Sequence, residues 1–485
     1  MEEVDVALIT KRSIHGIFAL TSRTFVIQIV SFLANFLLTI FLSPVIFGVY
    51  FVVSAAIAFL SYFSDIGLAA ALIQKKEAIT RQDLITTFTL QQILVISVVL
   101  IALLLSNFVG DFYHLGKDGV FLFQALAVAF FLSSLKTIPS IILERDLHFE
   151  KLVIPQIVET FFFSVVAVVL AIKGFGITSF TYAVLARGFS GVIVIYIISP
   201  WRIGFGFSKE SARKLLSFGI PFQLNSFLAL VKDDLFIAYL GKALPLAQVG
   251  FIGFAQKWAY APLRLIMDNV IRVTFPSFSR LQHEKEVLEK AIEKSIFAAC
   301  FLIFPALVGL VVLSPYLIHL IPKYLKWEPA LLSLALFSIN AALSSISTPL
   351  TNALNAIGKI KVSLYLMVFW TIATWVLTPI FIVFFGFNGV AGASALIATS
   401  VVLVVYLTKK YVKFNVLQAT MYPFLAAVVM GIAIYFLSPI LVKGLISLIL
   451  MICMGAVLYF LCIFLFARNE VLADARLVLR HLKIK

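Results

Sequence analysis

The chain has 485 residues, of which 62% are hydrophobic and 13% are charged, and its formal net charge is +15. Soluble globular proteins carry roughly 25% charged residues, so the composition excludes a soluble enzyme, a disordered chain and a nucleic-acid-binding domain. A transmembrane helix needs about 20 mostly apolar residues, and the chain has room for many. We therefore interpret the positive charge as a signal of membrane orientation.

Continuous apolar runs of about 20 residues follow one another along the chain, which predicts membrane helices rather than the alternating strands of a barrel. The expected spans are residues 14–42, 45–72, 84–108, 119–142, 152–172, 176–198, 215–240, 246–272, 295–321, 328–355, 362–385, 388–408, 417–437 and 443–466. The expected fold is thus an all-α polytopic membrane protein with about 14 transmembrane helices.

Lysine and arginine gather in alternate loops of this arrangement. With the N-terminus in the cytoplasm, about 27 of the 38 basic residues fall in cytoplasmic segments and about 6 in external ones. Cytoplasmic loops collect positive charge, so we expect a multi-pass protein of the cytoplasmic (inner) membrane with both termini inside the cell.

One cytoplasmic loop, residues 279–295, is longer than the others. Its apolar residues Leu281, Leu288 and Ile292 fall near helical spacing, with charges between them. The pattern predicts either a short amphipathic helix on the membrane surface or a solvated connector.

Two pairs of segments suggest an internal repeat. LSPVIFGVY resembles LPLAQVGFI, which aligns Gly48 with Gly250, and GFGITSFTYA resembles GFNGVAGASA, which aligns Gly174 with Gly386. The offsets correspond to six spans, and an even number of spans gives two halves of the same orientation, a design typical of alternating-access transporters. We expect two six-helix lobes around a central cavity and then a terminal helix pair and tail: residues 1–198, 199–414, 415–466 and 467–485.

The eighth span carries a polar stripe. Lys257, Tyr260, Arg264 and Asp268 lie within about 80° of one another at 100° per residue. Ionisable groups in a bilayer are costly and mark functional sites, so the stripe is expected to be the wall of a cavity that holds an anion. The alternative is a structural ion pair of Arg264 and Asp268, with Lys257 reaching an interface.

Other spans also contain polar side chains. Arg23 stands beside a polar stripe of the first span and faces either the cavity or the headgroups. The stripe that begins at Asn340 is expected either to pack against other helices, which the pattern favours, or to line water. The candidates for the cavity wall are Arg23, Asn35, Asn225, Lys232, Lys257, Tyr260 and Arg264. The candidates for ion coupling, each of which could instead form a structural pair, are Asp65, Glu159, Asp233, Asp234 and Asp268. The sequence contains no nucleophile–base pattern, metal cluster or cofactor motif, so no catalytic residue, metal or cofactor is expected.

Four stretches resemble the polysaccharide-biosynthesis flippases: LSPVIFGVY, FSDIGLAAALIQ, KDDLFIAYLGKALPLAQVGFIGFAQKW and VTFPSFSRLQ. That family includes O-antigen flippases and belongs to the multidrug/oligosaccharidyl-lipid/polysaccharide exporter superfamily. The resemblance implies twelve or fourteen spans in two lobes, with a cationic cavity lined by spans 1, 2, 7 and 8. It makes Arg23, Lys257 and Arg264 candidates for binding a pyrophosphate.

The resemblance also implies a function and partners. The chain would translocate a lipid-linked oligosaccharide of the polyprenyl-pyrophosphate type, in contact with membrane lipids and with the polymerase and glycosyltransferases of the pathway, and without nucleic acid. The alternative is an ion-coupled multidrug or small-solute antiporter of the same superfamily. A membrane glycosyltransferase is disfavoured because no loop is long enough for an external domain.

The topology can be tested by cysteine labelling at loop lysines. We expect the external group to react with a membrane-impermeant reagent in intact cells, and this group is Lys117, Lys242 and Lys326. The internal group should react only after the membrane is opened, and it is Lys76, Lys209 and Lys410. Reversed labelling at several of these sites would refute the predicted topology.

Overall fold

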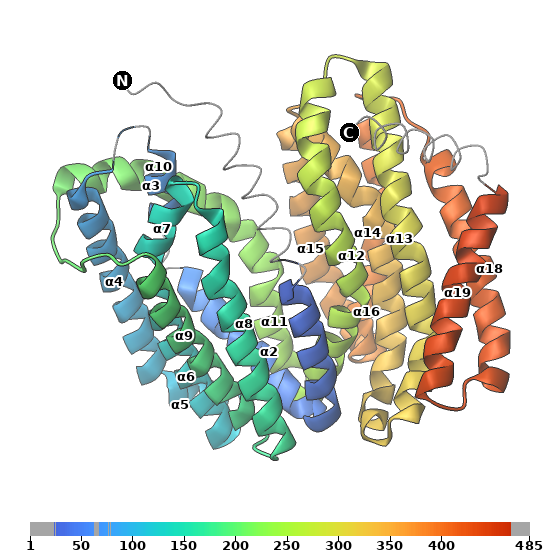
Figure 1. Ribbon diagram of the computed structural model, residues 1–485, viewed down its shortest axis with the longest axis horizontal. Coiled ribbons are helices and arrows are strands. Elements are labelled where there is room, and N and C mark those ends of the chain that lie inside the picture. The colour runs from blue at the N-terminus through green and yellow to red at the C-terminus, as the bar shows by residue number, and fades with distance from the viewer. Residues whose placement is uncertain (1–23, 25, 63–66, 76, 78, 467–485) are drawn as a thin grey trace. The chain divides into compact units, whose positions relative to one another are not determined.

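The computed structural model describes residues 24, 26–62, 67–75, 77 and 79–466, and within this part every regular element is a helix (Figure 1). The side chains of residues 218, 220–222 and 224–229 are outside the description. The helical content confirms the predicted all-α polytopic membrane fold. The chain forms two compact units, Met1–Gly250 and Phe251–Lys485. The lobe boundaries predicted from the repeat stay a prediction.

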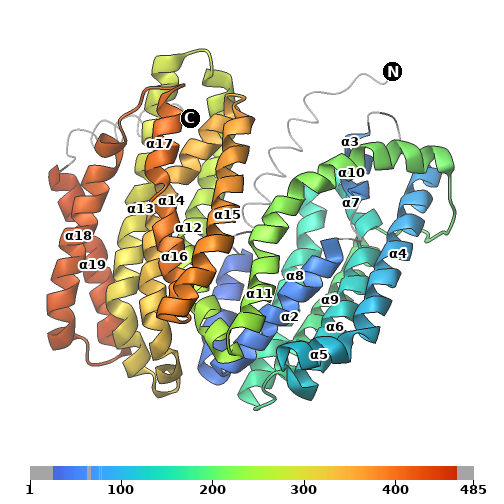
Figure 2. The same cartoon turned by 180° about the vertical axis from the view of Figure 1, so that it is seen from behind.

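The first unit consists mainly of long helices that run antiparallel to their neighbours in the chain. After an apolar helix at Val26–Phe41, its elements are α2 (Pro44–Tyr62), α3 (Leu68–Gln74), α4 (Arg81–Leu104), α5 (Ser106–Tyr113), α6 (Gly116–Leu135), α7 (Thr137–Arg145), α8 (Phe149–Ile172), α9 (Thr178–Ile198), α10 (Lys209–Lys232), α11 (Asp234–Ala243) and the start of α12 (Leu246–Leu281). α8 packs along α9, α6 packs on α9, and α2 lies beside α11 (Figure 2).

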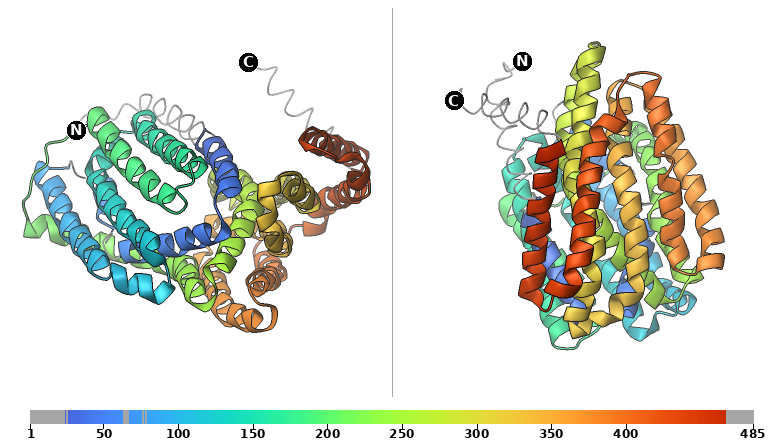
Figure 3. Two further views of the ribbon diagram at one scale, coloured as in Figure 1. Left: turned by 90° about the horizontal axis from the view of Figure 1, so that it is seen from below. Right: turned by 90° about the vertical axis from the view of Figure 1, so that its right-hand side faces the viewer.

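In the described chain, the second unit contains the rest of α12 and eight further helical elements, one of which is a 3-10 helix. These are α13 (Lys285–Leu320), η1 (Pro322–Ala330), α14 (Leu331–Ala356), α15 (Ile360–Phe385), α16 (Asn388–Ala398), α17 (Val401–Lys409), α18 (Val416–Leu441) and α19 (Leu445–Phe466). α13 packs against α14 and α18, and α18 pairs with α19 (Figure 3).

Eleven helical segments of the described chain are long and apolar enough to cross a membrane. They correspond to predicted spans 2–6 and 9–14, and the total of about 14 stays a prediction. The long helix α12 is not among them, and α10 contains side chains that are outside the description. Lys257, Arg264 and Asp268 lower the hydropathy of α12, the helix in which the sequence predicts the wall of a cavity.

Several predicted spans are not single helices. The span 45–72 is divided between α2 and α3, with the left-handed Gly67 (φ +71°) immediately before α3. Lys136 separates α6 from α7, and Asp233 separates α10 from α11. Backbone groups freed at such breaks must find other partners inside a membrane protein, so the breaks bring polar atoms into the spans.

The loop at residues 279–295 differs from both of its predicted forms. α12 continues to Leu281 and α13 begins at Lys285, so most of the segment belongs to these two long helices. Leu288 and Ile292 are fully buried in a cluster with Val412 and Phe414. The chain itself therefore covers the apolar face that was expected to lie on a membrane surface or to remain solvated.

The segment between α9 and α10 is held onto the N-terminal end of α4. The N–H groups of Gly206 and Ser208 donate to the hydroxyls of Thr89 and Thr86, at 3.0 and 3.1 Å. The Ser211 hydroxyl donates to the buried Asp83 carboxylate at 2.8 Å. Because α4 supplies all three partners, the start of α10 is fixed to the first unit.

The glycines that the sequence repeat aligns meet each other in the first unit. A Cβ atom on Gly48 would overlap the carbonyl oxygen of Leu246, and a Cβ atom on Gly250 would overlap that of Pro44. The contact is reciprocal, since each glycine lies against the backbone four residues before the other. Small residues let membrane helices approach to backbone distance, and the reciprocity is what an approximate twofold relation between the two segments produces.

The close contact of Gly48 with Gly250, which we call the glycine crossing, predicts that glycine-to-alanine changes differ strongly in their effect on stability from one position to another. Gly48→Ala should lower the free energy of unfolding by at least about 2 kcal/mol, because an added methyl group has no space against backbone. Gly309→Ala is the control, since no atom lies within 4 Å of the Cβ position of Gly309 on α13. It should change stability by less than about 0.5 kcal/mol. Thermal melting of the purified proteins measures both, and equal melting temperatures would contradict the proposed crossing.

Candidate functional site

The charged stripe of α12 is exposed on that helix. Lys257, Arg264 and Asp268 are all exposed, whereas Ala255 and Ala259 on the opposite face are fully buried. Met267 is also buried and packs in a cluster with α13 and α14. α12 therefore turns its apolar side to its neighbours in the second unit and leaves the predicted stripe accessible.

Arg264 and Asp268 are not joined by an ion pair in the part of the chain that the structure describes. The structural pair that the sequence offers as an alternative is thus not formed. Arg264 and Asp268 can therefore each interact with other groups, which favours a binding surface over a structural ion pair.

Tyr260, at the edge of the stripe, takes part in a polar network between helices. Its hydroxyl lies 3.1 Å from Asn340 Oδ1 on α14 and 3.3 Å from Ser394 Oγ on α16. Asn340 Nδ2 donates to the Ser394 carbonyl at 2.8 Å. The network ties three helices of the second unit together, and this is the packing role expected for the polar stripe of the tenth span.

The three consecutive charges after α10 are separated by a helix break. Lys232 is the last residue of α10, Asp233 lies between the helices, and Asp234 begins α11. The ammonium of Lys232 is 4.0 Å from the Asp233 carboxylate. Asp234 stands in the first turn of α11, where a helix favours negative charge. The break lets neighbouring residues point to different environments.

The remaining candidates are less fully defined. Arg23 and Asp65 lie outside the described residues, as does the side chain of Asn225 on α10. Asn35 Nδ2 donates to the Ser31 carbonyl of its own helix at 2.6 Å. The candidates of the first unit and the stripe of α12 belong to different units, so their convergence on one cavity stays a prediction.

Glu159 has formed partners inside the first unit. Its carboxylate accepts a hydrogen bond from Lys136 Nζ at 2.5 Å, and Arg187 Nε lies 3.6 Å away. Gly191 on α9 makes room for this carboxylate, since a Cβ atom there would overlap it. Pairing, one of the two alternatives for Glu159, is therefore present in the structure.

Lys136 was missed by the sequence reasoning. A usable signal was present, because Lys136 stands inside a predicted span and the next span contains an equally isolated Glu159. Opposite charges in consecutive antiparallel membrane helices are expected to pair. The described residues contain no group of three His, Cys, Asp or Glu side chains that could hold a metal ion.

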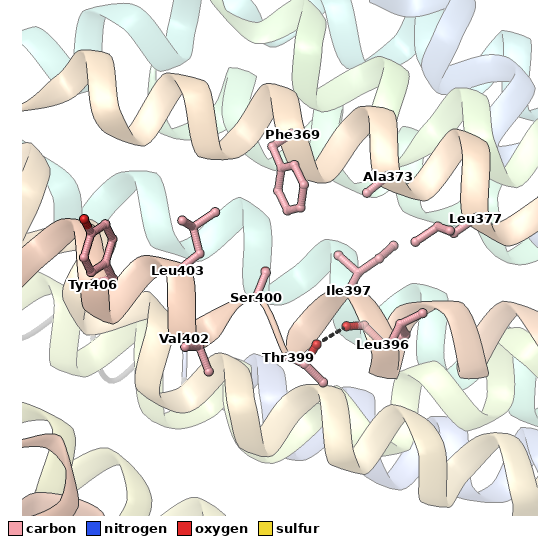
Figure 4. A pocket seen from close by; sticks show the side chains of 10 residues that line it. All are labelled: Phe369, Ala373, Leu377, Leu396, Ile397, Thr399, Ser400, Val402, Leu403 and Tyr406. Carbon is pink, nitrogen blue, oxygen red and sulfur yellow. Dashed lines mark hydrogen bonds between the residues drawn. The ribbon is translucent and has the colours of Figure 1, made fainter.

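An apolar pocket of about 620 Å³ lies between α15 and the α16–α17 pair (Figure 4). Phe369, Leu377 and Leu403 are among its lining residues, and Thr399 turns its hydroxyl to the Leu396 carbonyl at 2.7 Å. Such a lining offers little for a sugar or a phosphate, so this pocket is not the candidate polar site.

Comparison with known proteins places the chain among polysaccharide biosynthesis proteins. A family model described as polysaccharide biosynthesis protein matches residues 37–331. The lipopolysaccharide biosynthesis protein WzxC of Escherichia coli K12 is 27% identical over 334 residues, 67% of this chain and 66% of WzxC. The teichuronic acid biosynthesis protein TuaB of Bacillus subtilis 168 is 27% identical over 311 residues, 62% of each chain. The matches thus span just under two thirds of these relatives.

Two solved structures share the fold. The lipid II flippase MurJ, in an inward closed conformation, superposes with a TM-score of 0.76 at 14% identity, covering 93% of this chain and 99% of MurJ. An inward-facing multidrug resistance transporter of the MATE family, from the MOP superfamily, gives 0.61 at 16% identity, covering 81% and 98%. The architecture is therefore that of MurJ and MATE transporters.

The polar network at Asn340 predicts a stability effect. Asn340→Ala removes the hydrogen bonds to α12 and α16, and should lower the free energy of unfolding by about 1–2 kcal/mol. Asn269→Ala is the control, because Asn269 on α12 is exposed and its amide donates only to the Leu265 carbonyl of its own helix. Melting temperatures in detergent measure both, and equal losses in the two variants would refute the network.

Proposed function

Because the chain belongs to the polysaccharide biosynthesis protein family, we propose that it is a flippase that moves a lipid-linked oligosaccharide across the cytoplasmic membrane. An oligosaccharide cannot cross about 30 Å of hydrocarbon unaided, since each unsatisfied polar group costs several kcal/mol. A flippase supplies a polar path for the sugar, while the lipid tail stays in the bilayer.

The observation that carries the proposal is the accessible stripe of α12. Lys257 and Arg264 are exposed on a helix whose opposite face is buried in the second unit. Cations of this kind bind phosphate through charge-assisted hydrogen bonds, and arginine does so with a two-pronged fork. The names of WzxC and TuaB, which refer to lipopolysaccharide and teichuronic acid, support a saccharide substrate.

In this proposal Arg23, Lys257 and Arg264 bind the pyrophosphate of the substrate. Asn35, Asn225, Lys232 and Tyr260 complete the polar wall. The carboxylates of Asp65, Asp233, Asp234 and Asp268 are the candidates for coupling an ion to transport. The lipid-linked oligosaccharide is carried unchanged, and the protein makes and breaks no bond in it.

The proposal includes a location and neighbours. The protein lies in the cytoplasmic membrane with both termini inside the cell, as the distribution of basic residues favours. Glycosyltransferases complete the substrate on the inner face and a polymerase takes it up on the outer face. Removal of the product on the outer face would help to drive transport in one direction.

An ion-coupled multidrug or small-solute antiporter is the second candidate, because the MATE transporter shares the fold. A transport assay separates the two. Proteoliposomes that contain a fluorescent lipid-linked oligosaccharide in the inner leaflet should show its appearance outside. Exchange of a cationic dye for protons, without movement of the oligosaccharide, would favour the antiporter.

Arg264 provides the sharpest test of the site. Arg264→Ala should reduce oligosaccharide translocation about tenfold or more, because a charge-assisted hydrogen bond to phosphate is lost. Arg264→Lys should retain part of the rate, since lysine keeps the charge and loses the fork. Arg280→Ala, at the far end of the same helix, is the matched control and should transport normally. Full translocation by the Arg264→Ala protein would remove Arg264 from the site.

A further inference from the structure

Arg187 occupies an unusual place in the first unit. It lies near the middle of α9, about 14 Å from one end of that helix and about 16 Å from the other at 1.5 Å per residue. Its side chain is nevertheless 56% exposed. An arginine at such a depth in a membrane-spanning helix faces an aqueous cavity, a protein partner or an anion, because contact with hydrocarbon is costly.

A pocket of about 340 Å³ lies beside Arg187. Lys136, Glu159 and Arg187 all line it, and Gln156 and Thr160 of α8 add polar groups. Its walls come from α7, α8 and α9, which pack on one another within the first unit (Figure 1), from the turn at Lys136 before α7, and from Ile27 of the helix Val26–Phe41. The pocket belongs to the first unit, whereas the stripe of α12 belongs to the second unit.

The charges in the pocket do not balance. Two cations share one carboxylate, which leaves a formal charge of about +1 when all three groups are ionised. The sharing is also unequal. Lys136 is 17% exposed and holds Glu159 at 2.5 Å, whereas Arg187 approaches it only with Nε at 3.6 Å. In the described part of the chain, no hydrogen bond holds either terminal nitrogen of Arg187.

We propose that this pocket is an anion subsite, in which Arg187 binds a phosphate group while Glu159 stays with Lys136. The guanidinium presents its two terminal nitrogens as a fork, the geometry that matches phosphate. Gly191 makes room for the Glu159 carboxylate, which lies on the Nε side of Arg187 at 3.6 Å and occupies neither terminal nitrogen of the fork.

The ligand of the subsite rests on the proposed function. A phosphate can reach it as the headgroup of a prenyl pyrophosphate, as the headgroup of an anionic phospholipid or as a free anion. All three share the chemistry that Arg187 recognises. We expect the prenyl pyrophosphate to bind best, because its hydrocarbon chain remains in the membrane while its headgroup enters the pocket.

Binding to the full-length protein in phosphatidylcholine nanodiscs tests the proposal. The probes are farnesyl pyrophosphate, inorganic pyrophosphate and farnesol, each titrated by calorimetry, and phosphatidylglycerol nanodiscs test competition by a lipid headgroup. Arg187→Ala should weaken farnesyl pyrophosphate binding at least about tenfold. Arg187→Lys should weaken it less, and Arg202→Ala, an exposed arginine in the loop after α9, should leave it unchanged.

The Glu159→Gln variant distinguishes a pocket that binds an anion from an ion-pair cluster that is merely structural. The change preserves the size of the side chain and removes the negative charge that competes with the ligand, so binding should become about threefold to tenfold tighter. Arg187→Gln, which keeps a polar side chain, replaces Arg187→Ala if that protein melts at a lower temperature. Weaker or unchanged binding by Glu159→Gln, or equal binding by the Arg187→Ala and Arg202→Ala proteins, would overturn the subsite.

The probes also identify the source of the phosphate. Strong binding of inorganic pyrophosphate alone, or displacement of farnesyl pyrophosphate by phosphatidylglycerol, would overturn the assignment to a prenyl headgroup. The subsite and the proposed function fail separately. Normal Arg187-dependent binding without oligosaccharide translocation by the unchanged protein would refute the flippase alone, whereas translocation with binding indifferent to Arg187 would refute the subsite alone.

Discussion

Hydrocarbon does not solvate charge, and this constraint governs the whole protein. Every backbone group must find a partner within its own helix or a neighbouring one, which explains why the described regular elements are all helical. Every ionisable side chain at depth must be paired, solvated or bound. Glu159 is paired with Lys136 and Arg187. The stripe of α12 stays accessible and thus depends on water or a ligand.

The same constraint explains how far the sequence could be interpreted. Long apolar runs admit little besides membrane helices, so the all-α polytopic fold follows from composition and run length. Helix breaks are harder to predict, because Asp233 and Lys136 differ little in sequence context from charges inside continuous helices. Their effect depends on tertiary partners, and hydropathy contains no information about these.

Periodicity identified the stripe of α12 correctly as one face of a helix, and the structure exposes its three charged members. It could not separate Tyr260 from them, since the tyrosine lies on the same face and its role is set by Asn340 and Ser394, residues 80 and 134 positions away. Lys136 was missed for a similar reason: a charge pair between helices is a property of two segments, and a single-span pattern contains only one of them.

The crossing of Gly48 and Gly250 has a consequence for how the protein can change over time. In most helix contacts, a larger residue on one side can be accommodated by a smaller residue on the other. Here each glycine lies directly against the backbone of the opposite segment, and no side chain can be shortened to make space. A larger residue in one of these two segments therefore cannot be offset by a smaller side chain in the other, and any enlargement must move an entire helix.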